Sequence, residues 1–168
     1  MSQLKTEAGE PPKVAVVGVG NTFRSDDAAG ILAARALSAR QGNREDHLLI
    51  VEAGHAPENR AGELRRFAPD LVLFIDAAEM GEEPGAIRLI SEEDIDGMSA
   101  STHSLPLSML ARYLSLELNC KVILLGIQSG SNEVGETVSA EVVQAVQETV
   151  TGLHEWIWVQ TSSASEAF

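Results

Sequence analysis

Short, mainly apolar segments rich in β-branched residues recur along the chain. They alternate with longer segments that have the spacing of amphipathic helices. The apolar segments cover residues 13–19, 47–51, 71–75 and 121–127. Strands that are apolar at every position, rather than at alternate positions, are typical of a parallel sheet buried on both faces. The pattern therefore predicts an α/β fold with a mostly parallel sheet and helices on both sides.

Helices are expected over residues 27–40, 59–67, 105–118 and 139–159, and an edge strand is expected over residues 86–90. The last two helices each carry an apolar stripe that should face the sheet. The stripes consist of Leu107, Leu110, Leu114 and Leu118 in one helix and of Val143, Val146, Val150, Leu153 and Ile157 in the other.

Several side chains have an expected structural role at the ends or on the faces of these helices. Ser25 or Asp26 is expected to cap the first helix, and Asn59 is expected to cap the second. Trp156 and Trp158 are expected to pack the last helix against the core, since aromatic residues at helical spacing usually belong to a core.

The chain length of 168 residues suggests a single domain. We expect the folded domain over residues 13–160, with flexible tails at residues 1–12 and 161–168. The net charge of −13 argues against a nucleic-acid partner, which needs a basic surface, and against an anionic membrane surface.

A cytoplasmic protein without a membrane partner is expected. No apolar run approaches the roughly 20 residues of a membrane helix, and the first residues lack the apolar core of a signal peptide. Cys120 is the single cysteine, which excludes an intrachain disulfide and a Cys-rich zinc site and fits a reducing compartment.

Polar residues stand at three places where the strands of a parallel sheet would end. Asp26 and Asp27 follow the first strand through a glycine loop, Asp76 follows the third strand, and His103 lies in a Ser/Thr-rich loop before a helix. Sites in such sheets form beyond the carboxyl ends of the strands. Two carboxylates and an imidazole suit a divalent first-row metal and leave positions open for water or substrate.

Each of these residues also has a structural interpretation. Asp27 can serve as a helix cap or as a partner of the helix dipole, and Asp76 can bind loop amides. A single histidine before a helix, such as His103, is often structural.

Other chemistries have weaker support. The sequence GVGN at 18–21 suggests a dinucleotide site, but Phe23 stands where the third glycine is required and would crowd the helix–strand contact. Neither a Walker A loop nor a G-x-S-x-G nucleophile elbow is present. Cys120 precedes an apolar strand and is interpreted as a packed thiol, and His47 and His154 as surface or structural residues.

Four segments occur in an order and spacing that resemble a known family. They are GVGNTFRSDDAAG (18–30), FIDAAEMGEEPGAIRLI (74–90), STHSLPL (101–107) and LLGIQSG (124–130). Together they resemble the hydrogenase maturation endopeptidases, especially the branch that processes hydrogenase-3-type large subunits. The resemblance extends from about residue 14 to residue 150.

The resemblance implies a single three-layer α/β/α domain with a twisted, mainly parallel sheet of about five strands. It implies an aspartic-type endopeptidase that removes the C-terminal extension of a nickel-loaded NiFe hydrogenase large-subunit precursor. The metal-contacting and catalytic residues would be Asp27, Asp76 and His103. The precursor would supply the nickel, no organic cofactor would be needed, and a monomer is expected.

The chain departs from the family pattern at three positions. Ala28 and Ser129 stand where the family often has Gly and Pro, and His55 stands in a loop position often held by Thr. His55 would either reach the site as an additional ligand or face the solvent. These differences concern the choice of substrate more than the activity.

Three alternatives remain open at this point. One is a metal-dependent hydrolase of small molecules that keeps its own ion. Another is a hydrogenase assembly factor without proteolytic activity. The third is a nucleotide-binding α/β domain, which the missing third glycine disfavours.

Overall fold

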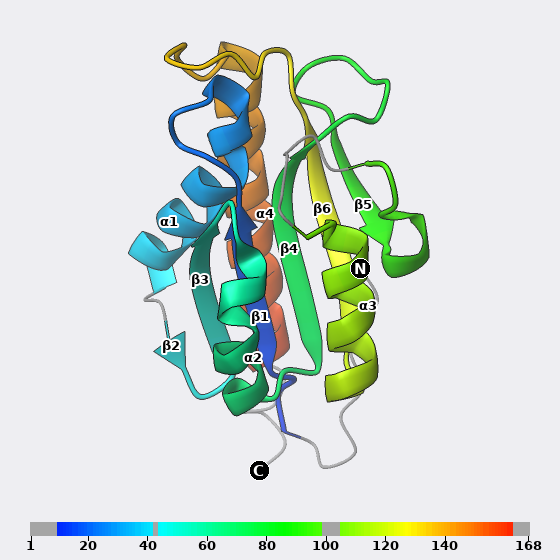
Figure 1. The fold of residues 1–168 in the computed structure, drawn as a ribbon. Coiled ribbons are helices and arrows are strands. Elements are labelled where there is room, and N and C mark those ends of the chain that lie inside the picture. The colour runs from blue at the N-terminus through cyan, green and yellow to red at the C-terminus, as the bar shows by residue number, and fades with distance from the viewer. Residues whose placement is uncertain (1–9, 42–43, 99–104, 163–168) are drawn as a thin grey trace.

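The computed structural model describes residues 10–41, 44–98 and 105–162. Its sheet has the strand order β2-β3-β1-β4-β6-β5 (Figure 1). The central strands β1 (Val14–Val19), β3 (Leu48–Gly54), β4 (Leu71–Ala78) and β6 (Lys121–Gln128) are parallel to one another. Two edge strands, β2 (Arg44–Glu45) and β5 (Ile87–Ser91), are antiparallel to their neighbours. The predicted α/β fold with a mainly parallel sheet is confirmed.

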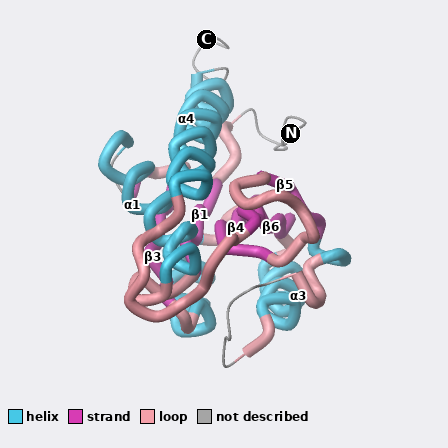
Figure 2. Tube along the Cα trace, turned by 90° about the horizontal axis from the view of Figure 1, so that it is seen from above, coloured by secondary structure: helices cyan, strands magenta, loops and turns pink. Residues whose placement is uncertain are grey.

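The helices cover both faces of the sheet (Figure 2). On one face lie α1 (Ala29–Gln41) and α4 (Ala140–Ser162), and on the other lie α2 (Ala61–Phe67) and α3 (Leu107–Leu118). Short 3₁₀ turns precede α1 and α2 and follow β5: η1 (Ser25–Ala28), η2 (Pro57–Arg60) and η3 (Glu92–Asp94).

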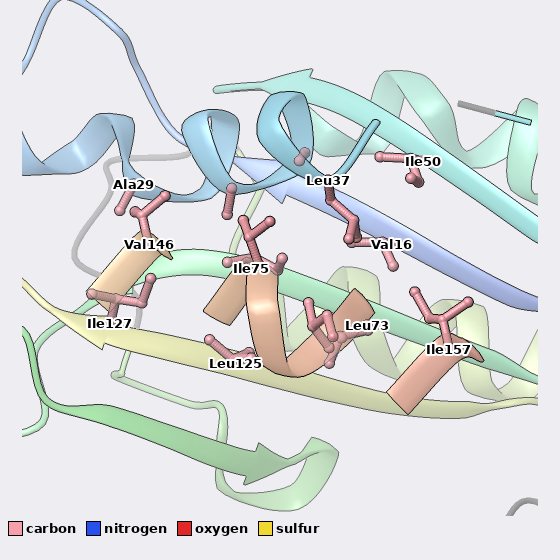
Figure 3. Close-up of a cluster of buried hydrophobic side chains, with 14 of the residues drawn as sticks. Val16, Ala29, Leu37, Ile50, Leu73, Ile75, Leu125, Ile127, Val146 and Ile157 are labelled. Carbon is pink, nitrogen blue, oxygen red and sulfur yellow. The ribbon is translucent and has the colours of Figure 1, made fainter. Parts of the chain in front are cut away.

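Alternate residues of the buried strands supply two separate cores. Val16, Leu73 and Ile75 point toward α1 and α4, where they meet Leu37 and Val146 (Figure 3). The intervening strand residues, among them Val72 and Phe74, point toward α2 and α3. This two-sided burial explains why the central strands are apolar at nearly every position.

Several detailed expectations are wrong, although the elements themselves are present. The first turn of the helix expected at 27–40 is the 3₁₀ turn η1, and no side chain caps η1 or α2, so the caps expected from Ser25, Asp26 and Asn59 are not made. In α4 the packed stripe includes Val142, while Val143 is 40% exposed. Tertiary contacts override the simple helical pattern at these ends.

The two tryptophans of α4 differ in burial. Trp156 packs against the core, as expected, but Trp158 is 66% exposed, so that part of the prediction is wrong. At the other end of the chain Pro12 is already buried and the backbone N–H of Lys13 donates to Asp70 Oδ2 at 2.7 Å. Among the helices that the structure describes, none combines the length and apolar character needed to cross a bilayer.

Glycines let α1 approach the sheet closely. A Cβ at Gly30 would lie 2.0 Å from the carbonyl oxygen of Ile75 and 2.3 Å from that of Val19, and a Cβ at Gly18 would lie 2.3 Å from the carbonyl oxygen of Gly30. Phe23, expected to crowd this contact, is instead 78% exposed. The close approach places the N-terminal end of α1, and with it η1, against the end of β4.

Candidate functional site

Buried polar side chains gather at one end of the sheet, beyond the carboxyl ends of the parallel strands. Among the described residues, the buried polar side chains are Ser25, Asp26, Asp27, Asp76, Gln128, Ser129 and Thr149. All except Thr149 lie in η1, near the end of β4, or at the end of β6 and just after it. Burial of carboxylates carries a large desolvation cost, so three buried aspartates at one strand edge mark a candidate functional site.

The loop between β1 and η1 holds Asp27 at this edge. The side chain of Asp27 is 5% exposed. Its backbone N–H donates to Arg24 at 2.9 Å, and its carbonyl oxygen accepts from the N–H of Asn21 at 3.0 Å. Gly20 has a φ of +136°, and a Cβ there would lie 1.8 Å from the Asp27 carbonyl oxygen. Glycine is therefore required for the loop to close this tightly.

Asp76 lies near the end of β4 and is fully buried. It pairs with Gly126 of β6, whereas the pairing of β4 with β1 extends only to Ile75. Side chains alternate along a strand, so Asp76 is on the face of Phe74, which α2 and α3 cover. Because η1 contacts β4, Asp27 and Asp76 lie at the same sheet edge, as expected from the strand ends.

Asp26 is directed into the protein and anchors a second loop. Its Oδ2 accepts hydrogen bonds from the backbone N–H groups of Gly130 at 2.8 Å and Ser131 at 3.0 Å. Its Oδ1 accepts from the backbone N–H of Ser139 at 2.7 Å, and the Ser139 hydroxyl donates to both oxygens at 2.9 and 3.0 Å. The carboxylate therefore ties η1 to the loop between β6 and α4.

The pKa of Asp26 is lowered from its ordinary value of 3.8. Burial acts to raise it, but the combined hydrogen bonds from the backbone of Ser139, Ser131 and Gly130 and from the Ser139 hydroxyl outweigh burial. Because the folded-state pKa is depressed, the contribution to stability is complete above the ordinary pKa and is lost as the pH falls through the folded-state value.

The substitution Asp26→Asn is expected to lower the free energy of unfolding by about 2 kcal/mol near neutral pH, because the amide NH₂ would face backbone donors. The difference between the wild type and the variant should begin to shrink as the pH falls below the ordinary pKa of 3.8, where the carboxyl group of the unfolded chain takes up a proton, and it should be lost as the pH falls through the lower folded-state pKa. Urea unfolding between pH 3 and pH 7 measures both effects. A difference that is unchanged across this range would contradict the role of the Asp26 charge.

A hydrogen-bond network around Glu79 fixes the ends of β4 and β6 to each other. The Ser129 hydroxyl donates to Glu79 Oε1 at 2.7 Å, and Gln128 Nε2 donates to Glu79 Oε2 at 3.2 Å. Gln128 Oε1 accepts from the backbone N–H of Met80 at 2.7 Å. The backbone N–H of Ser129 donates to Ala78 at 3.3 Å. A proline at position 129 could make neither contact of Ser129, so the departure from the family pattern has a structural consequence here.

The third predicted ligand, His103, lies outside the described residues. Within the part of the chain that the structure describes, no three His, Cys, Asp or Glu side chains form a group suited to a metal ion. The structure thus brings Asp27 and Asp76 to one sheet edge. The third donor of the expected set remains a prediction from the sequence.

An open cleft of ≈ 320 Å³ borders the loop after β1. Its lining includes Gly20, Phe23 and His55. One side carries the ion pair between Arg35 and Glu52, whose atoms are 2.7 Å apart. His55 is exposed, which agrees with its solvent-facing interpretation. The cleft is large enough for several atoms of a bound peptide.

Cys120 has no place in this site. Its side chain is 8% exposed, and its Sγ donates to the carbonyl oxygen of Leu114 at 3.7 Å. Burial raises the pKa of the thiol, so it stays protonated at neutral pH. The interpretation of Cys120 as a packed thiol is confirmed.

Sequence reasoning missed the supporting residues around the two candidate ligands. The acceptor role of Asp26, the network of Glu79 and Gln128, and the Ser139 donor depend on contacts between segments far apart in the chain, with Asp26 and Ser139 separated by 113 positions. The one available signal was the occurrence of polar residues directly after apolar strands, which applies to Glu79 and Gln128 as well as to Asp76.

Comparisons with known proteins agree with this arrangement. A family model described as hydrogenase maturation protease matches residues 31–158. The hydrogenase 3 maturation protease of Escherichia coli K12 is 39% identical over 112 residues, which cover 66% of this chain and 69% of that protein.

Two solved structures share both fold and sequence features with the chain. The NiFe hydrogenase maturation protease HycI of Thermococcus kodakarensis has a TM-score of 0.79 and 31% identity, covering 89% of this chain and 94% of its own. The endopeptidase HycI of Escherichia coli has a TM-score of 0.75 and 32% identity, covering 86% and 90%. The chain therefore belongs to the hydrogenase maturation protease family and is an endopeptidase of that family.

Proposed function

We propose that this endopeptidase removes the C-terminal extension of a nickel-loaded NiFe hydrogenase large-subunit precursor. The family membership supports the reaction class and the kind of substrate. The observation that carries the proposal is the gathering of the buried carboxylates. Within the described residues, every buried aspartate or glutamate lies at the carboxyl-terminal end of the parallel strands, which the cleft borders.

Asp27, Asp76 and His103 are proposed to contact the nickel that the precursor brings with it. Carboxylate oxygens and an imidazole nitrogen are suitable donors for a divalent first-row metal. Both aspartates are held by backbone elements, Asp27 by the closed loop at Gly20 and Asp76 by the paired strands β4 and β6. A site held in this way can recognise a metal geometry without keeping a metal of its own, and no organic cofactor is required.

The proposed chemistry is an aspartic-type hydrolysis of one peptide bond. A carboxylate of the Asp27–Asp76 pair positions a water molecule and takes its proton as the water oxygen attacks the scissile carbonyl carbon. The bond between that carbon and the amide nitrogen breaks, and the nitrogen leaves with a proton. When bound, the substrate's nickel supplies orientation and Lewis-acid polarisation of the carbonyl.

The proposal also covers the cellular compartment and the oligomeric state of the protein. We propose that the protein acts in the cytoplasm, where its single buried thiol, Cys120, is compatible with reducing conditions. It is proposed to act as a monomer on the precursor.

The test is a cleavage assay with the purified protein and the hydrogenase large-subunit precursor encoded in the same genome. The mass of the precursor is followed by mass spectrometry. Loss of a C-terminal peptide is the expected result. Binding of the precursor with no change of mass would contradict proteolysis and favour an assembly factor. Metal-dependent hydrolysis of small esters or amides, with the precursor left intact, would favour a small-molecule hydrolase.

A further inference from the structure

An apolar groove lies between β5 and α4, on the face of the sheet opposite α2 and α3. Its floor and walls are formed by Ile87, Leu89, Leu125, Leu153 and Trp156, together with Glu148, Thr149 and Gly152. The groove has a volume of ≈ 340 Å³. Ile87 is 39% exposed and Leu89 is 46% exposed, although both belong to a strand of the sheet. Two large apolar side chains on an otherwise covered sheet face indicate a binding surface.

The outer side of this groove is an open sheet edge. In the described part of the chain β5 is the last strand of the sheet, and β6 is its neighbour (Figures 1 and 2). The backbone N–H of Gln128 donates to the carbonyl oxygen of Ala86 at 2.8 Å, and this bond fixes which residues of β5 direct their backbone groups toward β6. The backbone N–H and C=O groups of Ile87, Leu89 and Ser91 are therefore directed away from β6, where a further strand can pair with them.

Two polar atoms in the groove lining also lack partners. The indole Nε1 of Trp156 and the hydroxyl oxygen of Thr149 are buried, and neither makes a hydrogen bond with any residue that the structure describes. Buried polar groups in native proteins normally have a partner.

The charge of the groove selects the kind of peptide. Glu148 lines the groove, and Glu141 and Glu155 are exposed at seven-residue spacing from it on the same side of α4. The helix contains no Lys or Arg to offset this ridge of carboxylates. A segment with apolar side chains toward the groove and basic side chains toward the ridge is complementary to it.

A row of paired residues connects the strand beside the groove with the candidate site, and the Asp76 side chain lies on the opposite face of the sheet from the groove. Asp76 pairs with Gly126, and Gly126 pairs with Arg88, so these three residues form one row across β4, β6 and β5. The loop between β4 and β5 is also fixed to β5 by the ion pair between Glu82 and Arg88. A strand added beyond β5 would lie about 14 Å from Asp76, three strand spacings away, a distance that about five extended residues span.

We propose that the edge of β5 and this groove bind an extended, apolar and basic segment of the precursor as an added strand. The inference rests on the proposed function, since it places the polypeptide substrate of that site. The bound segment would be separated from the scissile bond by at least about five residues. Nickel recognition would then select the maturation state of the precursor, and the groove would select its polypeptide sequence.

Steady-state cleavage of the nickel-loaded precursor tests this surface through Leu89→Lys and Glu148→Lys. Each variant is expected to raise KM about tenfold and to leave kcat within about twofold, because it removes binding without touching the reacting atoms. The matched controls are Leu116→Lys and Glu117→Lys, exposed positions on α3 across the sheet, which should leave both constants unchanged. If the precursor is cleaved and KM is the same for the wild type and all four variants, the docking surface is overturned and the proposed function stands.

A binding measurement tests the docking surface independently of cleavage. A synthetic peptide with the sequence of the precursor's C-terminal extension is added, and amide hydrogen exchange of the protein is followed by NMR. Slower exchange at Ile87, Leu89 and Ser91 is expected, and this effect should be lost in Leu89→Lys. If that protection occurs but the precursor is never cut, the docking surface stands and the proteolytic function fails. If sedimentation shows a dimer that Leu89→Lys converts to a monomer, the edge pairs with a second copy of this chain and the docking proposal is overturned.

Discussion

Replacing Asp76 by Asn is expected to lower the rate of precursor processing by about 10²–10⁴-fold while the fold is retained. The change is isosteric, and it removes a negative charge from a fully buried position near the end of β4. Stability should therefore stay the same or increase, because the desolvation cost of the carboxylate disappears. Processing should nevertheless fail, since the amide is a poorer metal donor and cannot take a proton from water.

The same loss of activity is expected for Asp27→Asn and for His103→Ala. Asp46→Asn is the matched control: Asp46 is an exposed aspartate before β3, at the opposite end of the sheet. It should process the precursor at the wild-type rate. Rates are measured by the appearance of the mature large subunit on denaturing gels, with circular dichroism as the check on folding. Processing at the normal rate by a folded Asp76→Asn or His103→Ala protein would exclude that residue from the site.

The substitution Gly30→Ala is expected to be strongly destabilising, although it adds a single methyl group. Its Cβ would lie 2.0 Å from the carbonyl oxygen of Ile75 and 2.3 Å from that of Val19. Both obstacles are backbone atoms of central strands, so relief requires α1 to move away from the sheet. We expect the free energy of unfolding to fall by about 4 kcal/mol, which corresponds to a drop in melting temperature of roughly 8–16 °C.

Gly152→Ala provides the matched control for this stability prediction. Gly152 lies within α4, and a Cβ there would have no atom within 4 Å. Alanine has the higher helix propensity, so this variant should gain about 0.5–1 kcal/mol. Thermal unfolding of both variants measures the two effects. A Gly30→Ala protein with the stability of the wild type would mean that the contact between α1 and the sheet is looser than described.

The central strands could be predicted from the sequence because burial on both faces leaves a direct mark. Residues 71–75 are apolar at every position, and β4 contains all of them. The continuation of β4 through Asp76 to Ala78 could not be predicted in this way, since the strand changes there from a packing role to a site role. The edge strand expected over residues 86–90 was also recognisable, from its loose alternation and its position after a Gly-Pro-rich loop, and it corresponds to β5.

The ends of the helices were harder to predict, for a physical reason. Asp26 has the sequence position of a helix cap, but its carboxylate instead accepts hydrogen bonds from the backbone N–H groups of Gly130, Ser131 and Ser139. Val143 fits the apolar spacing of α4 but is 40% exposed, and its neighbour Val142 packs in the core instead. Local patterns describe one element at a time, whereas these outcomes depend on segments that meet only in the folded protein.

The placement of Asp27 and Asp76 shows what strand-end reasoning can and cannot supply. The rule that sites form beyond the carboxyl ends of parallel strands identified both residues, and both are buried at that edge. The rule did not identify the roles of Gly20 and Gly30, which depend on close approaches of the backbone. Nor did it identify the groove beside β5, whose lining comes from three separate elements.

The most direct test of the central claim compares cleavage of the nickel-loaded precursor with cleavage of the same precursor prepared without nickel. Both samples receive the same amount of the protease, and the mass of the large subunit is followed over time. We predict loss of the C-terminal peptide from the nickel-loaded precursor alone, with no cleavage by Asp76→Asn in either sample. Equal cleavage of the two precursors would contradict the claim that Asp27, Asp76 and His103 recognise the substrate's nickel.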